Sequence, residues 1–313
     1  MSIVVEKAGL QTTIQSQPRV GTRHLGVPAS GPADALSMAL ANRLVGNGPL
    51  TPALETTLTG ATLRFEVATN VAVTGAVAKC MLNGKPVPLH KTLAVGVGDV
   101  VVVGAAESGV RNYIAVAGGL VADDVLGSRS TYMSAKFGGY KGRALSEGDE
   151  LTLTDPAASS PPLETPQEYR LPMLEAWSVR AGWSSETQSL ANPQRLFTAK
   201  LRVGSRCDRM GIKLEGESFS STESAQMPSV PVFPGIIQCP QDGSLMIMSV
   251  DAGTTGGYPR VAKIARMDLH VLGQLRPGNS IRFIERTNAD AARELREKHA
   301  YWKHWIADIA DVI

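Results

Sequence analysis

Residues 251–259 combine groups that can stabilise negative charge developing on a substrate oxygen. They read Asp-Ala-Gly-Thr-Thr-Gly-Gly-Tyr-Pro and follow an apolar run over 245–250, which predicts a loop leaving a buried strand. Glycine tolerates positive φ and lets successive N–H groups point at one oxygen, while Thr254 and Thr255 add hydroxyl donors. The alternative is a tight glycine turn that only caps the strand.

From this loop we predict a catalytic role for several residues. The N–H groups and hydroxyls from Thr254 to Gly257, with Gly256 between them, form an oxyanion cradle, and Asp251 moves a proton. Tyr258 walls the pocket and offers its phenol as a donor. Loss of one such donor costs about 3–4 kcal/mol in the barrier, so substitutions here are expected to inactivate the protein without unfolding it.

A second polar segment, Arg206-Cys-Asp-Arg-Met-Gly211, places two cations around one carboxylate. A guanidinium beside a small pocket can bind a carboxylate or phosphate through two parallel hydrogen bonds. We therefore predict that Arg209 binds the anionic part of the substrate. A structural pair between Asp208 and Arg209 is the alternative. A further polar, small-residue loop lies over 127–132.

In the N-terminal half, Arg19, Arg23 and His24 precede Ser30, and a helix is expected to begin just after it. Unpaired N–H groups at a helix start suit an anion, which makes Ser30 a candidate substrate-binding residue. His24 is a candidate for proton transfer, the alternative being a structurally satisfied histidine. Glu55, in Ala-Leu-Glu-Thr-Thr, can serve as an acid or base and is a second substrate-binding candidate.

The sequence excludes several common catalytic templates. It contains no GxxxxGK[ST] phosphate loop, no strand-coupled GxGxxG, no HExxH and no GxSxG elbow. A Met-Lys-Met biotin attachment pattern is absent as well. Cys80, Cys207 and Cys239 stand far apart without CxxC or zinc spacing, so neither a disulfide framework nor a metal site is expected.

The elements that must position these loops are predominantly β-strands. The 31 glycines and 19 prolines punctuate short β-branched runs, which include 61–66, 70–74, 99–104 and 112–117. Asn83-Gly84 between apolar runs predicts a hairpin turn.

Two segments are predicted to be helical. The first covers Pro32–Val45, with proline at the first helical position and leucines on one face. The second covers Ala289–Ile309, where Leu295, Trp302 and Ile309 recur at seven-residue spacing.

At 313 residues the chain is long enough for two domains. A proline-rich connector over 155–166 divides it into a β-rich domain (1–158), a second domain (168–287) and a C-terminal helix (288–313). The net charge of +2 indicates no nucleic-acid binding. Without a signal peptide or long apolar stretch, we expect a cytoplasmic protein that does not associate with membranes.

In their order along the chain, these segments resemble the allophanate hydrolase subunit 2 family, also called the KipA-like family or the family of the 5-oxoprolinase C subunit. The resemblance extends over nearly the whole chain. It is carried by these motifs: Gly9-Leu-Gln-Thr-Thr13, Gly26-Val-Pro-Ala-Ser-Gly-Pro-Ala-Asp34, Leu40-Ala-Asn-Arg-Leu-Val-Gly-Asn47, Ala53-Leu-Glu-Thr56, Val116-Ala-Gly-Gly119, Leu126-Gly-Ser-Arg-Ser-Thr-Tyr132, Asp208-Arg-Met-Gly211, Pro234-Gly-Ile-Ile-Gln238 and Thr254-Thr-Gly-Gly-Tyr-Pro259.

The resemblance implies a mainly β (α+β) fold of two β-rich domains with a few peripheral helices, where at least one domain is a cyclophilin-like barrel, assigned to 168–287. It implies a partner of the allophanate hydrolase subunit 1 (KipI-like) type that shares the site. Fused relatives form the carboxyltransferase segment of urea carboxylase and enclose biotin and a small amide. Gln238 enters as a substrate-binding residue through this resemblance.

Three departures from the family pattern leave the substrate open. Gln15-Ser16 stands where the family usually has Gln-Asp, Cys207 where serine is common, and Leu245 where proline is usual.

The leading hypothesis is a subunit of an ATP-dependent hydrolase that opens a small lactam or amide, with 5-oxoproline as the first candidate. It resembles the C subunit of bacterial 5-oxoprolinase, which acts with an A-type and a B-type subunit, and ATP is expected at the shared site. The first alternative is the carboxyltransferase half of a biotin-dependent urea or amide carboxylase, the only case that needs biotin. The second is a regulatory module that binds a partner without catalysis. The isolated chain is expected to be folded and catalytically silent.

Overall fold

A computed structural model describes residues 2–155, 157–158, 160–220 and 227–313, so the predicted connector over 155–166 lies partly outside the described residues. The chain forms two compact units that interleave along the sequence. Unit 1 comprises Met1–Arg19, Ser30–Met173 and Trp302–Val312, and unit 2 comprises Val20–Ala29, Leu174–Tyr301 and Ile313. A short N-terminal segment thus belongs to the C-terminal unit, and a C-terminal segment to the N-terminal one.

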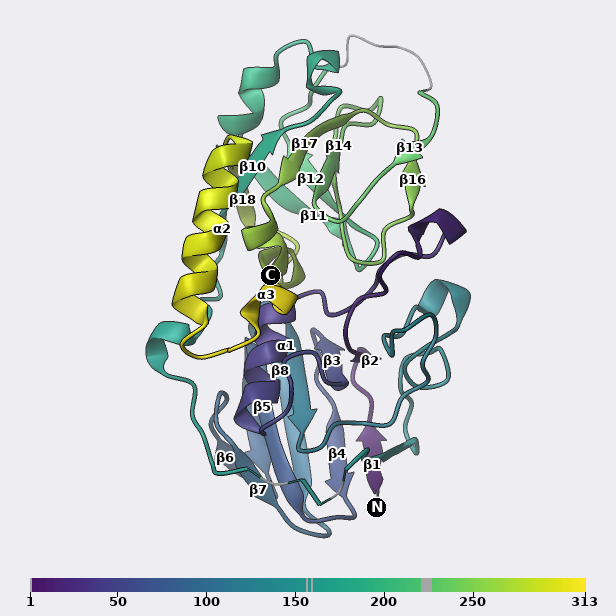
Figure 1. Ribbon diagram of the computed structural model, residues 1–313, viewed down its shortest axis with the longest axis vertical. Helices are drawn as coiled ribbons and strands as arrows, with labels where there is room; N and C mark the ends of the chain where they lie inside the picture. Colours follow the sequence, from purple (N-terminus) through teal and green to yellow (C-terminus); the bar gives the residue numbers. More distant parts are fainter. Residues whose placement is uncertain (1, 156, 159, 221–226) are drawn as a thin grey trace. The chain divides into compact units, whose positions relative to one another are not determined.

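In the described part of unit 1, nine strands form one sheet (Figure 1). Its main path runs β2-β3-β8-β4-β1-β9, and β5 pairs with β6, β7 and β8. Helix α1 (Ala35–Leu44) packs on β5 and β8. The strands are β1 (Ser2–Lys7), β2 (Gln11–Gln15), β3 (Ala53–Thr57), β4 (Thr62–Phe65), β5 (Thr69–Leu82), β6 (Lys85–Val87), β7 (Leu93–Val95), β8 (Val100–Val116) and β9 (Glu150–Thr152).

The local predictions for this sheet hold with one correction. Asn83 and Gly84 have φ of 52° and 75° and connect β5 to β6, as an Asn-Gly hairpin turn requires. The predicted strands 99–104 and 112–117 are wrong as separate elements, because both belong to the single strand β8. Register shifts in the pairing of β5 with β8 accommodate the irregular residues in the middle of β8, so this strand continues without a turn.

Unit 2 is a closed barrel with the order β10-β17-β14-β15-β12-β11-β18. Its core is apolar, and alternate residues of each strand point inward, as Leu245 and Ile247 do. A separate ribbon pairs β13 with β16. The strands are β10 (Ala176–Trp183), β11 (Leu201–Cys207), β12 (Gly211–Gly216), β13 (Val230–Pro231), β14 (Ile236–Gln238), β15 (Leu245–Met248), β16 (Thr255–Gly256), β17 (Arg260–Ile264) and β18 (Ser280–Glu285). The predicted mainly β fold with a barrel is confirmed.

The described helices are few. Helix α1 lies within the predicted range, whereas the predicted helix 289–309 is interrupted and becomes α2 (Asn288–Trp302) and α3 (Ile309–Val312). The break follows Trp302, whose ring contacts that of Tyr169 with centroids 5.3 Å apart, and Trp305 stacks on the same tyrosine. Short 3₁₀ turns are η1 (Arg23–Leu25), η2 (Met133–Ala135), η3 (Gln167–Tyr169), η4 (Thr187–Ser189), η5 (Pro193–Phe197) and η6 (Arg266–Gln274). None of these described helices is long and apolar enough to span a membrane.

Candidate active-site pocket

A cavity of about 500 Å³ opens on the outer surface of the barrel. Because Leu245 and Ile247 point into the core, Met246 and Met248 between them point outward and form one wall. Gly211 leaves room beside them, since a Cβ atom there would lie 3.0 Å from the Met246 sulfur. The remaining lining includes Arg206, Cys207, Asp208, Met210, Gln238 and Tyr258. The pocket therefore has an apolar, sulfur-rich wall with a few polar groups, as small-molecule sites usually do.

Gln238 is the most buried polar side chain of this lining, with 4% of its surface exposed. Its Nε2 donates to the backbone carbonyl of Tyr258 at 3.0 Å, which fixes the amide and leaves Oε1 as an acceptor. Gly256 lies against this amide: a Cβ atom there would be 2.6 Å from Nε2. Tyr258 is half exposed and lines this cavity, whereas Arg209 and His24, which were predicted to share its pocket, are not among the lining residues, so its role as a donor stays a prediction.

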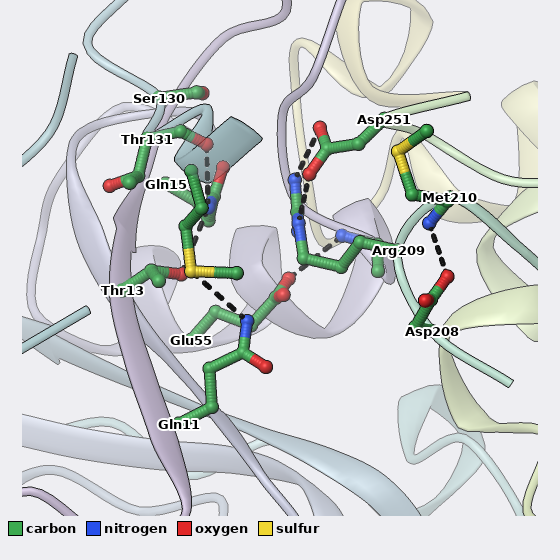
Figure 2. A network of polar contacts seen from close by, with 12 residues as sticks. Gln11, Thr13, Gln15, Glu55, Ser130, Thr131, Asp208, Arg209, Met210 and Asp251 are labelled. Atoms are coloured by element: carbon green, nitrogen blue, oxygen red, sulfur yellow. Dashed lines mark hydrogen bonds and ion pairs between the residues drawn. The ribbon is translucent and has the colours of Figure 1, made fainter. Parts of the chain in front are cut away.

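Arg209 and Asp251 form a buried ion pair (Figure 2). Arg209 Nε donates to Asp251 Oδ2 at 2.6 Å and Nη2 donates to Oδ1 at 3.1 Å, and the Asp251 N–H donates to the Arg209 carbonyl. The alternative pairing of Asp208 with Arg209 is wrong, because Asp208 instead accepts from the N–H groups of Met210 and Gly211. Asp251 thus offsets the charge of Arg209, whose predicted role in substrate binding stays a prediction.

Arg206 is the cation that lines the pocket. It is exposed and forms no ion pair with the described residues. Sequence reasoning placed both arginines around one carboxylate and selected Arg209. Burial and the pairing with Asp251, which lies 42 residues further along, distinguish Arg209 from Arg206.

The glycine-rich loop is more regular than predicted. Gly253, Gly256 and Gly257 are not among the glycines with positive φ, so the loop does not use the left-handed conformation that glycine tolerates. Instead, β16 pairs with β13, and the carbonyl of Thr254 accepts from Val232 N–H at 3.1 Å. Hydrogen bonds to β13 and to Val232 therefore satisfy part of the loop backbone, as the alternative of a strand-capping turn predicts.

The cradle itself stays a prediction. Thr254 and Gly257 are partly exposed and Thr255 is exposed. Tyr258 is the residue of the loop that lines the cavity.

The segment 20–29 is part of unit 2, and Arg23 anchors it there. The Arg23 guanidinium donates to the carbonyls of Val232 and Gly253 and lies 4.9 Å from the ring centroid of Phe233. Burial lowers the pKa of Arg23. His24, the next residue, lies exposed in η1, and its proton-transfer role stays a prediction.

In unit 1, Glu55 organises the start of α1. Its carboxylate accepts from the Ala33 N–H at 2.8 Å and from the Tyr113 hydroxyl at 2.7 Å, and Arg111 lies 3.4 Å away. The Tyr113 hydroxyl also accepts from the Asp34 N–H. Burial and the nearby Glu55 charge raise the pKa of Tyr113 well above its usual value. Arg111 and Tyr113 were not predicted, because their importance follows only from pairing between β3 and β8.

This network corrects the predicted anion site at the helix start. The Ala33 and Asp34 N–H groups bind side chains, and Asp34 caps the Ser37 N–H at 3.0 Å. With two carboxylates at the helix start, an added anion is disfavoured. Ser30 has φ of 55°, and its buried hydroxyl has no partner among the described residues, so its substrate-binding role stays a prediction.

The polar loop 127–132 runs along the edge of β2 (Figure 2). Ser130 Oγ accepts from the Ser16 N–H and donates to the Ser16 carbonyl, both at 3.0 Å, while Thr131 Oγ1 donates to Ile14. Gln15 adds a bond from Nε2 to Thr13 Oγ1 at 2.9 Å. Part of the polarity of this loop is therefore structural, since it closes a strand edge.

Comparison with known proteins agrees with the resemblance. A family model described as carboxyltransferase domain, subdomain A and B, matches residues 25–285. The C subunit of 5-oxoprolinase from Haemophilus influenzae is 34% identical over 304 residues, which are 96% of each chain. The urea amidolyase of Lachancea kluyveri is 34% identical over 321 residues, covering 94% of this chain and 17% of that protein. The K. lactis urea amidolyase structure superposes with a TM-score of 0.91 at 30% identity, covering 96% of this chain and 20% of that one.

Proposed function

Because the chain belongs to the family of carboxyltransferase domains with subdomains A and B, we propose that it is a subunit of an ATP-dependent hydrolase that opens a small lactam. The first candidate reaction is the conversion of 5-oxoproline to glutamate. The support is the 34% identity to a 5-oxoprolinase C subunit over 96% of both chains. The observation that carries the chemistry is the barrel pocket, which combines an amide acceptor, an unpaired cation and an apolar wall.

In this proposal the pocket recognises both polar ends of the lactam. Gln238 Oε1 accepts from the ring N–H, because its own Nε2 is held by the Tyr258 carbonyl. Arg206 binds the substrate carboxylate, since it is the cation of the pocket lining and pairs with none of the described carboxylates. Met246 and Met248 pack against the ring methylenes, which suits their flexible, polarisable side chains.

The buried pair of Arg209 and Asp251 positions the loops that line this pocket. Asp251 is linked to Arg209 through side chain and backbone, which fixes the turn from Asp208 to Gly211 against the start of the glycine-rich loop. Donors from Thr254 to Gly257 then stabilise charge on the lactam oxygen, and His24 moves a proton. ATP supplies the free energy that an unactivated amide bond requires for opening.

We further propose that catalysis requires other subunits. The relative from Haemophilus influenzae is itself named as one subunit of its enzyme, which supports partners of the subunit 1 (KipI-like) type and of the A type. The isolated chain is then folded and inactive.

A carboxyltransferase role is the second candidate, favoured by the TM-score of 0.91 to a urea amidolyase. In that role Gln238 Oε1 accepts from a urea N–H, and a partner delivers carboxybiotin. A regulatory module would bind the same partners without turnover of either substrate.

The test is co-purification of the chain with subunit-1-type and A-type partners, followed by measurement of ADP and glutamate with 5-oxoproline. Arg206→Gln is expected to raise KM about tenfold or more with little change in kcat, because it removes a charge-assisted bond to the ground state and transition state alike. Arg296→Gln is the matched control, since Arg296 is an exposed arginine of α2 away from the pocket.

Three results would separate the candidates. Lactam-dependent ATP hydrolysis by the complex supports the hydrolase. Carboxylation of urea by carboxybiotin without lactam turnover replaces it with the carboxyltransferase. If the chain binds its partners tightly and the complex shows neither activity, the regulatory module is the correct assignment. Robust turnover by the chain alone contradicts a site shared with a partner.

A further inference from the structure

A second cavity, of about 570 Å³, lies on a different part of the barrel surface, over β10, β18 and β11. Its lining contains three cationic side chains, Lys200, Arg202 and Arg282, and none of its described lining residues is acidic. The pocket with Gln238 lies over β12, β14 and β15, so the two cavities use largely different strands.

Strand register places the three cations on one outward face. Arg202 pairs with Ser280, and Arg282 pairs with Ser178 on the other side of β18. Extending the antiparallel register by one step places Lys200 opposite Arg282. Side chains directly opposite on one face have Cβ atoms about 4.5–5.5 Å apart. All five of these residues are exposed, so the face is accessible to a ligand.

Two of the three cations form no direct ion pair with the described residues. The side chains of Lys200 and Arg202 make no ion pair or hydrogen bond with described residues. Arg282 donates from Nε to Ser178 Oγ at 2.7 Å, which orients its guanidinium without neutralising it. By contrast, Arg180 and Arg260 of the same barrel each pair with a carboxylate.

Two carboxylates lie beside this face, and neither forms a direct ion pair with its cations. Glu217 pairs with Arg195 and accepts a hydrogen bond from the backbone N–H of Lys200, and the charge of Lys200 is one of the causes that lower its pKa. Glu215 lies opposite Arg202 on β12, but its carboxyl group is turned toward Gly204 and forms no ion pair with Arg202. The lining of this cavity therefore carries a net positive charge, with three cations and no acidic residue among its described members.

Like charges opposite each other in a sheet destabilise it. An anion that bridges them removes this repulsion, and guanidinium groups match phosphate oxygens through two parallel bonds. The cations extend over two adjacent strands, and hydroxyl groups of Ser178 and Ser280 lie on the same face. We propose that this face, formed by Lys200, Arg202 and Arg282 and called the cationic face, binds the polyphosphate chain of a small molecule. The proposal does not rest on lactam hydrolysis in the other pocket.

The test is calorimetric titration of the full-length chain with inorganic tripolyphosphate and with ATP at low ionic strength. Lys200→Gln and Arg202→Gln are each expected to weaken binding of both probes about tenfold, since each removes one charge-assisted contact. Lys263→Gln is the matched control, because Lys263 is an exposed lysine on β17 outside the cationic face. Raising the salt concentration to physiological levels should weaken binding by the wild type, since exposed charges are screened.

Thermal unfolding gives a second, independent measurement. Without ligand, the Lys200→Gln/Arg202→Gln variant is expected to melt at or above the wild-type temperature, because repulsion is removed. Tripolyphosphate should then raise the melting temperature of the wild type and of Lys263→Gln but not of this variant. No saturable binding of tripolyphosphate overturns the proposal. Equal weakening by Lys263→Gln, or binding of ATP without tripolyphosphate, overturns it as well.

Discussion

Replacing Asp251 with asparagine is expected to destabilise unit 2 strongly. Arg209 and Asp251 are 5% and 4% exposed, and both carboxylate oxygens accept from the guanidinium, at 2.6 and 3.1 Å. Each charge-assisted bond contributes about 1.5–3 kcal/mol, and removing one partner of a buried pair costs about 3–5 kcal/mol. Asparagine keeps one acceptor, so we expect a loss of about 3 kcal/mol in the free energy of unfolding.

The assay is urea unfolding followed by tryptophan fluorescence, to which Trp177 and Trp183 of unit 2 contribute together with the two tryptophans of unit 1. The variant Arg209→Met/Asp251→Leu is expected to lose less than the sum of its single variants, with an interaction energy of about 2 kcal/mol or more. A loss below about 1 kcal/mol for Asp251→Asn, or additive single losses, refutes the ion pair as the source of stability. If Asp251→Asn keeps its stability and loses activity, the aspartate acts in proton transfer instead.

Two further predictions concern the pocket and the pH dependence of stability. Gly256→Ala is expected to raise KM for the lactam several-fold, since a Cβ atom there lies 2.6 Å from Gln238 Nε2, whereas Gly257→Ala, with its nearest contact at 3.3 Å, should have a smaller effect in the same steady-state assay. Burial and the charge of Arg170 lower the pKa of His90 from 6.5 to about 4, so the unfolded chain binds the extra proton first as the pH falls. The wild type should therefore lose about 2–3 kcal/mol in the free energy of unfolding between pH 6.5 and pH 4. The His90→Asn variant, in which asparagine tolerates the φ of 61°, should not show this loss. An equal dependence of stability on pH in urea unfolding of both proteins contradicts the prediction.

The family and the candidate segments could be identified from the sequence because contiguous motifs define them. Gln238 and Tyr258 both line the pocket, and Gln238 was identified only through its motif. Arg209 was predicted to bind substrate in preference to Arg206, but nothing local distinguishes two arginines of one short segment, and the partner of Arg209 comes from elsewhere in the chain. Arg111 and Tyr113 gave no signal at all, since an isolated arginine or tyrosine in a strand is ordinary.

By itself the sequence determined the features that depend on neighbouring residues. The Asn83-Gly84 turn follows from two residues that tolerate positive φ, and the leucine spacing predicted a helix within 32–45, although it begins at Ala35 behind the Asp34 cap and not at Pro32. Glycine and proline spacing determined the β-rich class. These features are local because backbone sterics and capping act over a few residues.

Only the tertiary structure decided which distant groups meet. It joined two predicted strands into β8, because pairing with β5 along the whole length outweighs the local irregularity between them. It assigned 20–29 to the barrel unit through Arg23, and it paired Arg209 with Asp251 rather than with Asp208. Burying a charge is costly unless a partner lies within hydrogen-bond reach, and the residue that reaches it is fixed by how the strands are arranged, not by spacing along the chain.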